Sequence, residues 1–188
     1  MYKPENKWPS EFENKNHIFV DLNIDYEDIK NVLSQDLKWE NISPKKYLGY
    51  KQKYFEYQPK WLIDQFKLPI WSYIGFLVAC QKGENLCPHT DNGRTCAINI
   101  PAVPDYDKTT LEFWDFPDWQ YDQKWPDTSK GTKIEEVAYN SPILIRNRPH
   151  AVDNTSSEYD RITLSISFMP PYEFEVIADL IERGLLLE

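Results

Sequence analysis

Short runs of alternating hydrophobic and polar positions dominate the sequence from residue 71 onward. These runs are rich in β-branched and aromatic residues and are bounded by turn residues: 71–80, 94–101, 110–115, 132–139, 142–147, 150–154 and 161–168. Many short strands at close spacing are typical of an all-β sandwich or barrel, whereas βαβ units would need long helical patterns between the strands. The pattern therefore predicts a mainly β core over residues 71–168.

Residues 1–70 are expected to form an α/β flank of this core. The segment 17–22 predicts a short strand, and Asp25 is a candidate N-cap for the helix that follows. Four apolar residues recur there at helical spacing: Tyr26, Ile29, Val32 and Leu33. The segment 61–68 predicts one or two helical turns, which end at Pro69.

The remaining segments complete the picture of a single domain over residues 1–188. Residues 38–60 show no clear period and are expected to be irregular. Residues 171–184 predict an amphipathic helix packed outside the sheet, with its apolar face formed by Phe174, Ile177, Leu180 and Ile181. A chain of 188 residues can bury a sizeable core without disulfides or a structural metal.

The strand predicted at 161–168 has two different faces. The apolar face is formed by Ile162, Leu164, Ile166 and Phe168. The polar face is formed by Arg161, Thr163, Ser165 and Ser167. A half-exposed strand gives this pattern, and so does a strand whose polar face lines a cavity that Arg161 enters. The periodicity does not choose between them.

Composition and charge narrow the functional classes. The net charge is −9, with 30 Asp and Glu against 21 Lys and Arg. Nucleic-acid binders normally present a basic face, so we expect no nucleic-acid partner. The six glycines form no phosphate-binding cluster, which excludes a dinucleotide fingerprint or a P-loop.

The sequence shows no targeting or membrane signal. Residues 1–16 are polar and lack the apolar segment of a signal peptide, and no apolar run approaches the length of a membrane span. Cys80, Cys87 and Cys96 form no CxxC pair, which disfavours a disulfide framework. We expect a cytoplasmic protein without a membrane partner.

A His-x-Asp motif follows the predicted strand 71–80. His89 and Asp91 are two residues apart, so on an extended segment their side chains point to the same side. A second histidine, His150, begins a predicted strand further along the chain. Two histidines and one carboxylate form the facial triad that binds non-haem Fe(II). The third histidine, His17, has no partner motif and is expected to be structural or exposed.

Arg161 opens the predicted strand 161–168, shortly after His150. If 150–154 and 161–168 form an antiparallel hairpin, His150 and Arg161 are diagonal cross-strand neighbours. A guanidinium in that position would lie close to the metal and would hold a dicarboxylate in a bidentate grip. Thr163, on the same face, would add a hydroxyl.

With these residues the sequence resembles the Fe(II)/2-oxoglutarate-dependent oxygenases. The resemblance rests on HTD at 89–91 followed by RTCAINIP, and on PILIRNRPHAVDN and DRITLSISF, and it covers residues 73–168. It is similar to the small aspartyl/asparaginyl-β-hydroxylase-like and prolyl-hydroxylase-like members. The resemblance implies a double-stranded β-helix, a cupin-like jelly-roll, with a few flanking helices and the metal at one end.

The resemblance also implies roles for individual residues. His89, Asp91 and His150 would bind Fe(II), and Arg161 with Thr163 would bind the distal carboxylate of 2-oxoglutarate. The implied activity is a dioxygenase that uses O2 to hydroxylate an amino-acid, peptidyl or small-molecule substrate, with release of succinate and CO2. The presence of Asp91 argues against a halogenase, which needs that position vacant.

Several residues near the motif are weaker candidates. Arg94 is either a ligand for a carboxylate of substrate or cosubstrate or a strand-edge surface residue. Tyr73 is a candidate hydroxyl for 2-oxoglutarate, and Asn99 and Arg146 are further candidates of the same kind. Asn154 is expected to cap a turn.

Residues 104–130 contain Trp114, Trp119 and Trp125 among many acidic residues. The segment is either an aromatic loop packed on the surface or a lid over the substrate, because long loops in compact domains are often functional. Its acidity favours a cationic or neutral substrate over a strongly anionic one.

Two alternatives to an iron-dependent oxygenase stay open. Cys87 suggests a Cys/His/Asp zinc site, although ligands at 87, 89 and 91 would crowd one another on one strand. A non-catalytic cupin-like module would bind a metal without turnover. Arg161 separates the second alternative from an oxygenase, because a metal-only module has no need of a dicarboxylate anchor.

Overall fold

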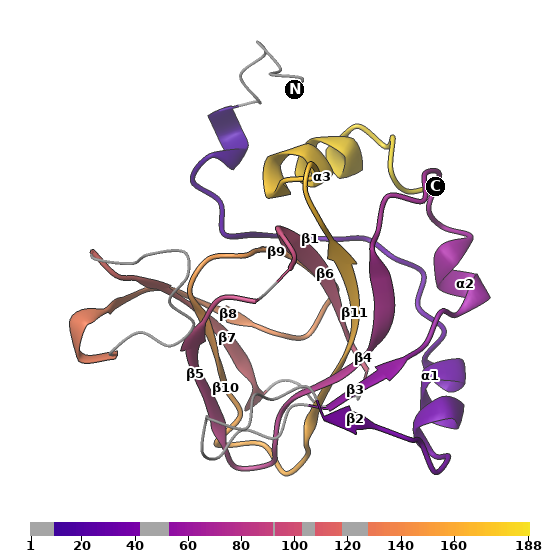
Figure 1. Cartoon of the computed structure of the whole chain (residues 1–188), viewed down its shortest axis with the longest axis horizontal. Coiled ribbons are helices and arrows are strands. Elements are labelled where there is room, and N and C mark those ends of the chain that lie inside the picture. Colours follow the sequence, from indigo (N-terminus) through magenta and orange to yellow (C-terminus); the bar gives the residue numbers. More distant parts are fainter. Residues whose placement is uncertain (1–9, 42–52, 92, 103–107, 118–127) are drawn as a thin grey trace.

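The structure is a computed structural model, and it describes residues 10–41, 53–91, 93–102, 108–117 and 128–188 (Figure 1). In these ranges the chain is mainly β: two antiparallel sheets hold eleven strands, and helices are few. The mainly β character predicted from the sequence is confirmed.

The larger sheet has seven strands. Their order across the sheet is β1 (His17–Phe19), β9 (Ile143–Arg146), β6 (Cys96–Pro101), β11 (Arg161–Phe168), β4 (Tyr73–Cys80), β3 (Lys53–Glu56) and β2 (Glu40–Asn41). The smaller sheet has the order β5 (Asn85–His89), β10 (His150–Asp153), β7 (Thr110–Asp115) and β8 (Thr132–Ala138). The N-terminal flank thus supplies edge strands of the larger sheet. Within it, β2 and β3 lie in residues that the sequence pattern left irregular.

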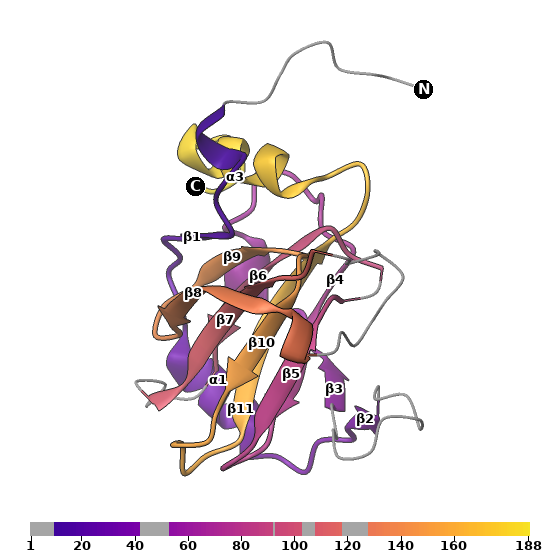
Figure 2. The same cartoon turned by 90° about the vertical axis from the view of Figure 1, so that its left-hand side faces the viewer.

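The strand pairings from β4 to β11 are nested. β4 pairs with β11, β5 with β10, β6 with β9 and β7 with β8, all of them antiparallel. The two sheets lie one against the other in Figure 2. This nesting brings residues that are far apart in the sequence to one end of the molecule.

The hairpin expected between His150 and Arg161 is wrong. β10 pairs with β5 and β7 in the smaller sheet, whereas β11 pairs with β4 and β6 in the larger sheet. The connection crosses from one sheet to the other. Asn154, fully buried, organises that crossing by donating from Nδ2 to the carbonyl oxygens of Gln81 and Tyr159, both at 2.9 Å.

Two apolar clusters fill the interior. The first lies between the two sheets and contains Cys80, Leu86, Ala97, Leu111, Phe113, Val137, Tyr139, Ile143, Ile145 and Val152. The second lies between the outer face of the larger sheet and the helices. Leu164, Ile166 and Phe168 of β11 belong to this second cluster. The polar face of β11 consequently points between the sheets, which decides the question that periodicity left open.

The helices cover the outer face of the larger sheet (Figure 1). They are α1 (Tyr26–Leu33), α2 (Lys60–Ile63) and α3 (Phe174–Glu182), with 3-10 turns at Ser10–Phe12 and Thr128–Lys130. Asp25 caps α1 as predicted, because its Oδ1 accepts a hydrogen bond from the Asp28 N–H at 2.9 Å. Among the described residues, no helix has the length and apolar character needed to cross a membrane.

Candidate metal centre

Three donor side chains converge where β5 and β10 lie side by side. His89 ends β5, His150 begins β10, and the two are cross-strand partners; Asp91 follows β5 directly. One ligand atom from each of the three lies within 4.8 Å of the others, and the histidines are only 6% and 4% exposed. The cluster can hold a metal ion, as the sequence motif predicts.

A β-bulge aims His89 at this cluster. His150 is paired with His89 and Val152 with Leu86, so β5 has one residue more than β10 between the two pairs. The extra residue places Leu86 and His89 on the same inward face although they are three positions apart. Cys87 does not join the cluster of metal donors found among the described residues. The zinc site built on Cys87 therefore has no support in this geometry.

Backbone carbonyl groups fix the orientation of both imidazole rings. His89 Nδ1 lies 2.9 Å from the Cys87 carbonyl oxygen, and His150 Nδ1 lies 2.8 Å from that of Arg148. A carbonyl oxygen only accepts, so each Nδ1 carries the hydrogen and each Nε2 presents its lone pair. The Nε2 atoms face Asp91, at 3.7 Å from His89 to Oδ1 and 3.4 Å from His150 to Oδ2.

The charge states of the cluster suit a cation. Burial, with a contribution from neighbouring His150, lowers the pKa of His89 to about 4, so this imidazole is neutral near pH 7. Burial raises the pKa of Asp91, but the Arg94 guanidinium and the two histidines outweigh burial and hold that pKa well below its usual value. A neutral imidazole and an ionised carboxylate are the forms that bind metals.

Arg94 holds one oxygen of the Asp91 carboxylate. Its Nε donates to Asp91 Oδ2 at 3.0 Å and its Nη2 donates to the same oxygen, while Nη1 donates to Ser165 Oγ at 3.1 Å. Oδ1 is left facing His89. The arginine that sequence reasoning offered for an outside carboxylate is thus only 8% exposed and paired with a carboxylate of the chain itself.

Asn147 ties the two ligand-bearing segments together. Its Oδ1 accepts from the Asp91 N–H at 2.8 Å, and its Nδ2 donates to the carbonyl oxygens of Asp91 at 2.8 Å and Arg94 at 2.7 Å. Because Asn147 precedes His150 by three residues, these bonds set the distance between Asp91 and His150. Sequence reasoning missed this residue, since no local pattern marks a buried asparagine whose partners are distant in the chain.

The donor cluster opens onto a cavity of about 30 Å³ between the sheets, which we call the inner cavity. Both sheets contribute to its walls: Leu77, Leu86, His89, Asp91, Arg94, Asn99, Leu111, Ile145, His150, Val152, Arg161 and Thr163. The structure thus brings the predicted metal ligands together with Arg161 and Thr163, although by a different strand arrangement from the one expected.

Arg161 is a buried charge without a counter-ion in the part of the chain that the structure describes. It is 2% exposed, and no carboxylate among the described residues lies within ion-pair distance of its guanidinium. The guanidinium lies over the Tyr139 ring, 4.0 Å from its centroid, and Nε has no hydrogen-bond partner. The Tyr139 hydroxyl is 3.2 Å from Thr163 Oγ1. A buried guanidinium that lacks an anionic partner can bind an anion from outside the chain.

The other sequence candidates fall into different places. Asn99 lines the inner cavity, where its Oδ1 accepts from Ser165 Oγ at 2.7 Å. Tyr73 opens β4, is 38% exposed and packs against Tyr54, away from the walls of that cavity. His17 lies 3.3 Å from Glu135, outside the donor cluster.

Residues of the expected lid are only partly described. Trp114 lies at the end of β7 and lines a second cavity, together with Arg146, rather than the inner cavity. Trp119 and Trp125 lie outside the described residues.

Comparison with known proteins gave no relative. A scan against protein-family models found no match, and searches of curated proteins and of solved structures gave no significant match. The function is therefore inferred from the site itself.

Proposed function

We propose that the chain is an Fe(II)- and 2-oxoglutarate-dependent dioxygenase with a jelly-roll core. The nested pairing supports the fold: strands β4 to β11 pair first with last, second with seventh, third with sixth and fourth with fifth. A long antiparallel ribbon folded over in this way gives the eight strands and two Greek keys of a jelly-roll. Its substrate would be an amino acid, a peptide or another small molecule.

One observation carries the proposal: Arg161 shares the inner cavity with the three metal donors and has no carboxylate partner among the described residues. Two histidines and a carboxylate leave metal positions open for a cosubstrate. A dicarboxylate that chelates the metal at one end reaches, at its other end, for a cation in the same cavity. Arg161 is suited to that role because a guanidinium binds a carboxylate in a bidentate manner.

The residues of the chain then have separate tasks. His89, Asp91 and His150 hold the metal, which supplies oxygen activation coupled to decarboxylation of 2-oxoglutarate when bound. Arg161, with Thr163 beside it, orients the dicarboxylate. Arg94 and Asn147 keep Asp91 in place. The apolar walls, among them Leu77 and Leu111, exclude water from the reacting groups.

Anaerobic titration of Fe(II) with and without 2-oxoglutarate tests the proposal. We expect a weak visible charge-transfer band only when both are present, followed by succinate formation on admission of air. Saturating Fe(II) and 2-oxoglutarate without this band would contradict the proposed function.

The volume of the inner cavity favours a second candidate function, a non-catalytic metal-binding module. About 30 Å³ accommodates roughly one water molecule, and 2-oxoglutarate is several times larger. A module of this kind would bind the metal with unchanged affinity whether or not 2-oxoglutarate is present. The same anaerobic titration separates the two functions, because only the oxygenase requires the lining side chains to move and admit the dicarboxylate.

A further inference from the structure

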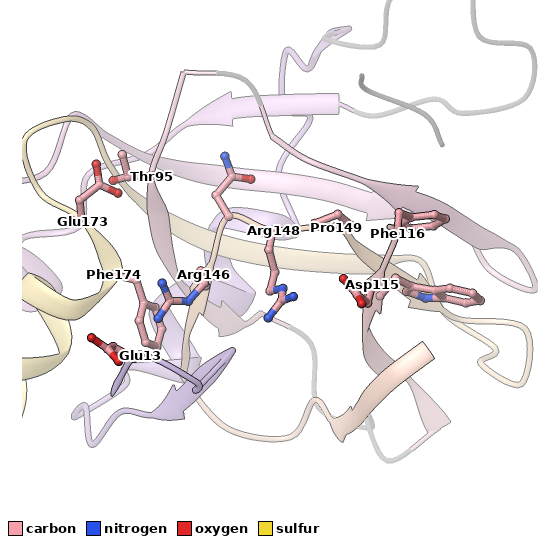
Figure 3. Close-up of a pocket in the computed structure, with 11 residues that line it drawn as sticks. Glu13, Thr95, Asp115, Phe116, Arg146, Arg148, Pro149, Glu173 and Phe174 are labelled. Carbon is pink, nitrogen blue, oxygen red and sulfur yellow. The ribbon is translucent and has the colours of Figure 1, made fainter. Parts of the chain in front are cut away.

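A second and larger cavity adjoins the metal centre. Its volume is about 370 Å³, within the range of small-molecule sites. It is lined by Glu13, Thr95, Trp114, Asp115, Phe116, Arg146, Asn147, Arg148, Pro149, Glu173 and Phe174 (Figure 3). We call it the outer cavity. None of its lining residues lines the inner cavity.

The outer cavity is connected to the metal donors through the chain. Pro149 lines it and precedes His150, while the Arg148 carbonyl oxygen accepts the hydrogen bond from His150 Nδ1. Asn147, also in its wall, accepts from the Asp91 N–H and donates to the Asp91 carbonyl oxygen. A molecule in the outer cavity therefore touches the segment that positions two of the three donors.

Arg148 and Asp115 carry opposite charges, line the outer cavity and do not pair with each other. Glu13 and Glu173 line the same cavity, and Figure 3 shows them on the side of Arg146 away from Asp115. Figure 3 shows Arg148 projecting between Arg146 and Asp115. The Arg148 side chain donates one hydrogen bond, from Nη1 to Asn16 Oδ1 at 2.6 Å, and no carboxylate among the described residues forms an ion pair with it. Asp115 is exposed and likewise has no ion pair within the described part of the chain. Both charges retain the capacity to bind a ligand.

The other arginine of the outer cavity, Arg146, is bound to groups of the chain itself. Arg146 forms an ion pair with Glu175, lies over the Phe174 ring at 4.5 Å and donates to the backbone of Phe12 and Lys15. These contacts fix the N-terminal segment and α3 to β9. Arg148 is consequently the arginine of this cavity that can donate hydrogen bonds to the carboxylate of a ligand.

We propose that the outer cavity binds a zwitterionic α-amino acid, whose carboxylate accepts from Arg148 and whose ammonium group donates to Asp115. Aromatic side chains form part of the walls: Trp114, Phe116 and Phe174. They favour an amino acid with an apolar side chain. That this amino acid is also the substrate of the metal centre rests on the proposed function. Its binding in the outer cavity does not.

Ligands that lack one charge test the inference directly. Binding of glycine, L-leucine and L-phenylalanine to the full chain is measured by calorimetry, and the best ligand is compared with its amide and its N-acetyl derivative. Each derivative loses one charge, and we expect each to bind about tenfold more weakly or worse. Saturable binding by none of the three amino acids, or equal affinity for the amide and the parent, would overturn the inference.

Two substitutions assign the charges to residues. Arg148→Gln should weaken the amino acid and the N-acetyl derivative but not the amide, and Asp115→Asn should weaken the amino acid and the amide but not the N-acetyl derivative. Arg183→Gln and Asp64→Asn, which remove surface ion pairs of α3 and α2, are the matched controls and should change nothing. Uniform weakening of all three ligands in Arg148→Gln would contradict the assignment.

Turnover separates this inference from the proposed function. With Fe(II), 2-oxoglutarate and air, the bound amino acid should stimulate succinate formation. Binding without stimulation would remove the amino acid as substrate and leave the binding site in place. Succinate formation without amino-acid binding would uphold the oxygenase and overturn the outer-cavity site.

Discussion

Two arginines face the inner cavity, and they differ in how their charge is compensated. Arg94 donates to the Asp91 carboxylate and to Ser165 and is 8% exposed. Arg161 is 2% exposed and lies on an aromatic ring with an unpartnered Nε. Burying a guanidinium costs several kcal/mol. Asp91 offsets that cost for Arg94, whereas the ring face offsets only about 2 kcal/mol or less for Arg161.

This difference divides the inner cavity into two ends: the metal end, with the three metal donors and Arg94, and the Arg161 end. At the metal end the carboxylate, both Nδ1 atoms and the Arg94 guanidinium have partners within the chain. At the Arg161 end, a buried positive charge is held without an anion among the described residues. In the proposed function, the metal end orients the metal donors and the Arg161 end selects the dicarboxylate.

The largest effect is expected at the metal end. His89→Ala removes one of three donors, so we predict loss of measurable Fe(II) binding and of succinate formation. Competition with a chromophoric chelator measures the metal affinity. His17→Ala is the matched control, because His17 lies outside the donor cluster and its substitution should leave metal affinity unchanged.

Arg161→Met tests the Arg161 end. Loss of a buried charged hydrogen-bonding partner costs about 2–5 kcal/mol, so the 2-oxoglutarate concentration needed for half-maximal succinate formation should rise about 30-fold or more. Fe(II) affinity should stay unchanged. The thermal midpoint of the metal-free variant should not fall, because the substitution removes an uncompensated charge. A variant that loses Fe(II) binding would place Arg161 among the structural supports of the metal end.

Arg94→Gln tests the metal end by removing the guanidinium that holds Asp91. Loss of an outer-shell partner of a metal ligand typically costs 10- to 100-fold in metal affinity, and we expect a decrease of about that size. The matched control is Arg146→Gln, which removes another arginine–carboxylate pair that does not touch a metal ligand. Equal losses in both variants would mean that Arg94 acts only on general stability.

Lowering the pH tests the metal end in the metal-free protein. The pKa of His89 falls from 6.5 to about 4 on folding, so the unfolded chain binds the proton more readily. The free energy of unfolding of the metal-free protein should therefore decrease as the pH falls from about 6.5 to about 4. The contribution of this residue is at most about 1.4 kcal/mol per pH unit. Denaturant titrations at several pH values measure it, and the decrease should be smaller in His89→Gln.

Local signals in the sequence predicted the strands better than their partners. β7 and β11 have the predicted bounds, because alternation and turn residues are local features. The pairing of β10 with β5 and β7 was not predictable from the turn-rich connection alone, and the expected hairpin was wrong. The bulge that turns His89 inward depends on that pairing and shows no pattern in the sequence.

The sequence predicted the three candidate metal donors but not the residues that hold them in place. The His-x-Asp motif and the distal histidine marked the metal donors, since few side chains bind metals and the chain has only three histidines. Arg94 and Asn147 support Asp91 through contacts that the fold creates. For Arg94 the sequence left open an outside carboxylate or a place at the strand edge, because sequence shows charge but not which carboxylate lies nearest.

Calorimetric titration of 2-oxoglutarate tests most directly whether the two ends form one site. The titration is carried out on the full chain with and without Mn(II), a redox-inert substitute for Fe(II), and on Arg161→Met under the same conditions. We predict tight binding only when Mn(II) and Arg161 are both present. The same 2-oxoglutarate affinity in the absence of the metal, or in Arg161→Met loaded with Mn(II), would contradict the account.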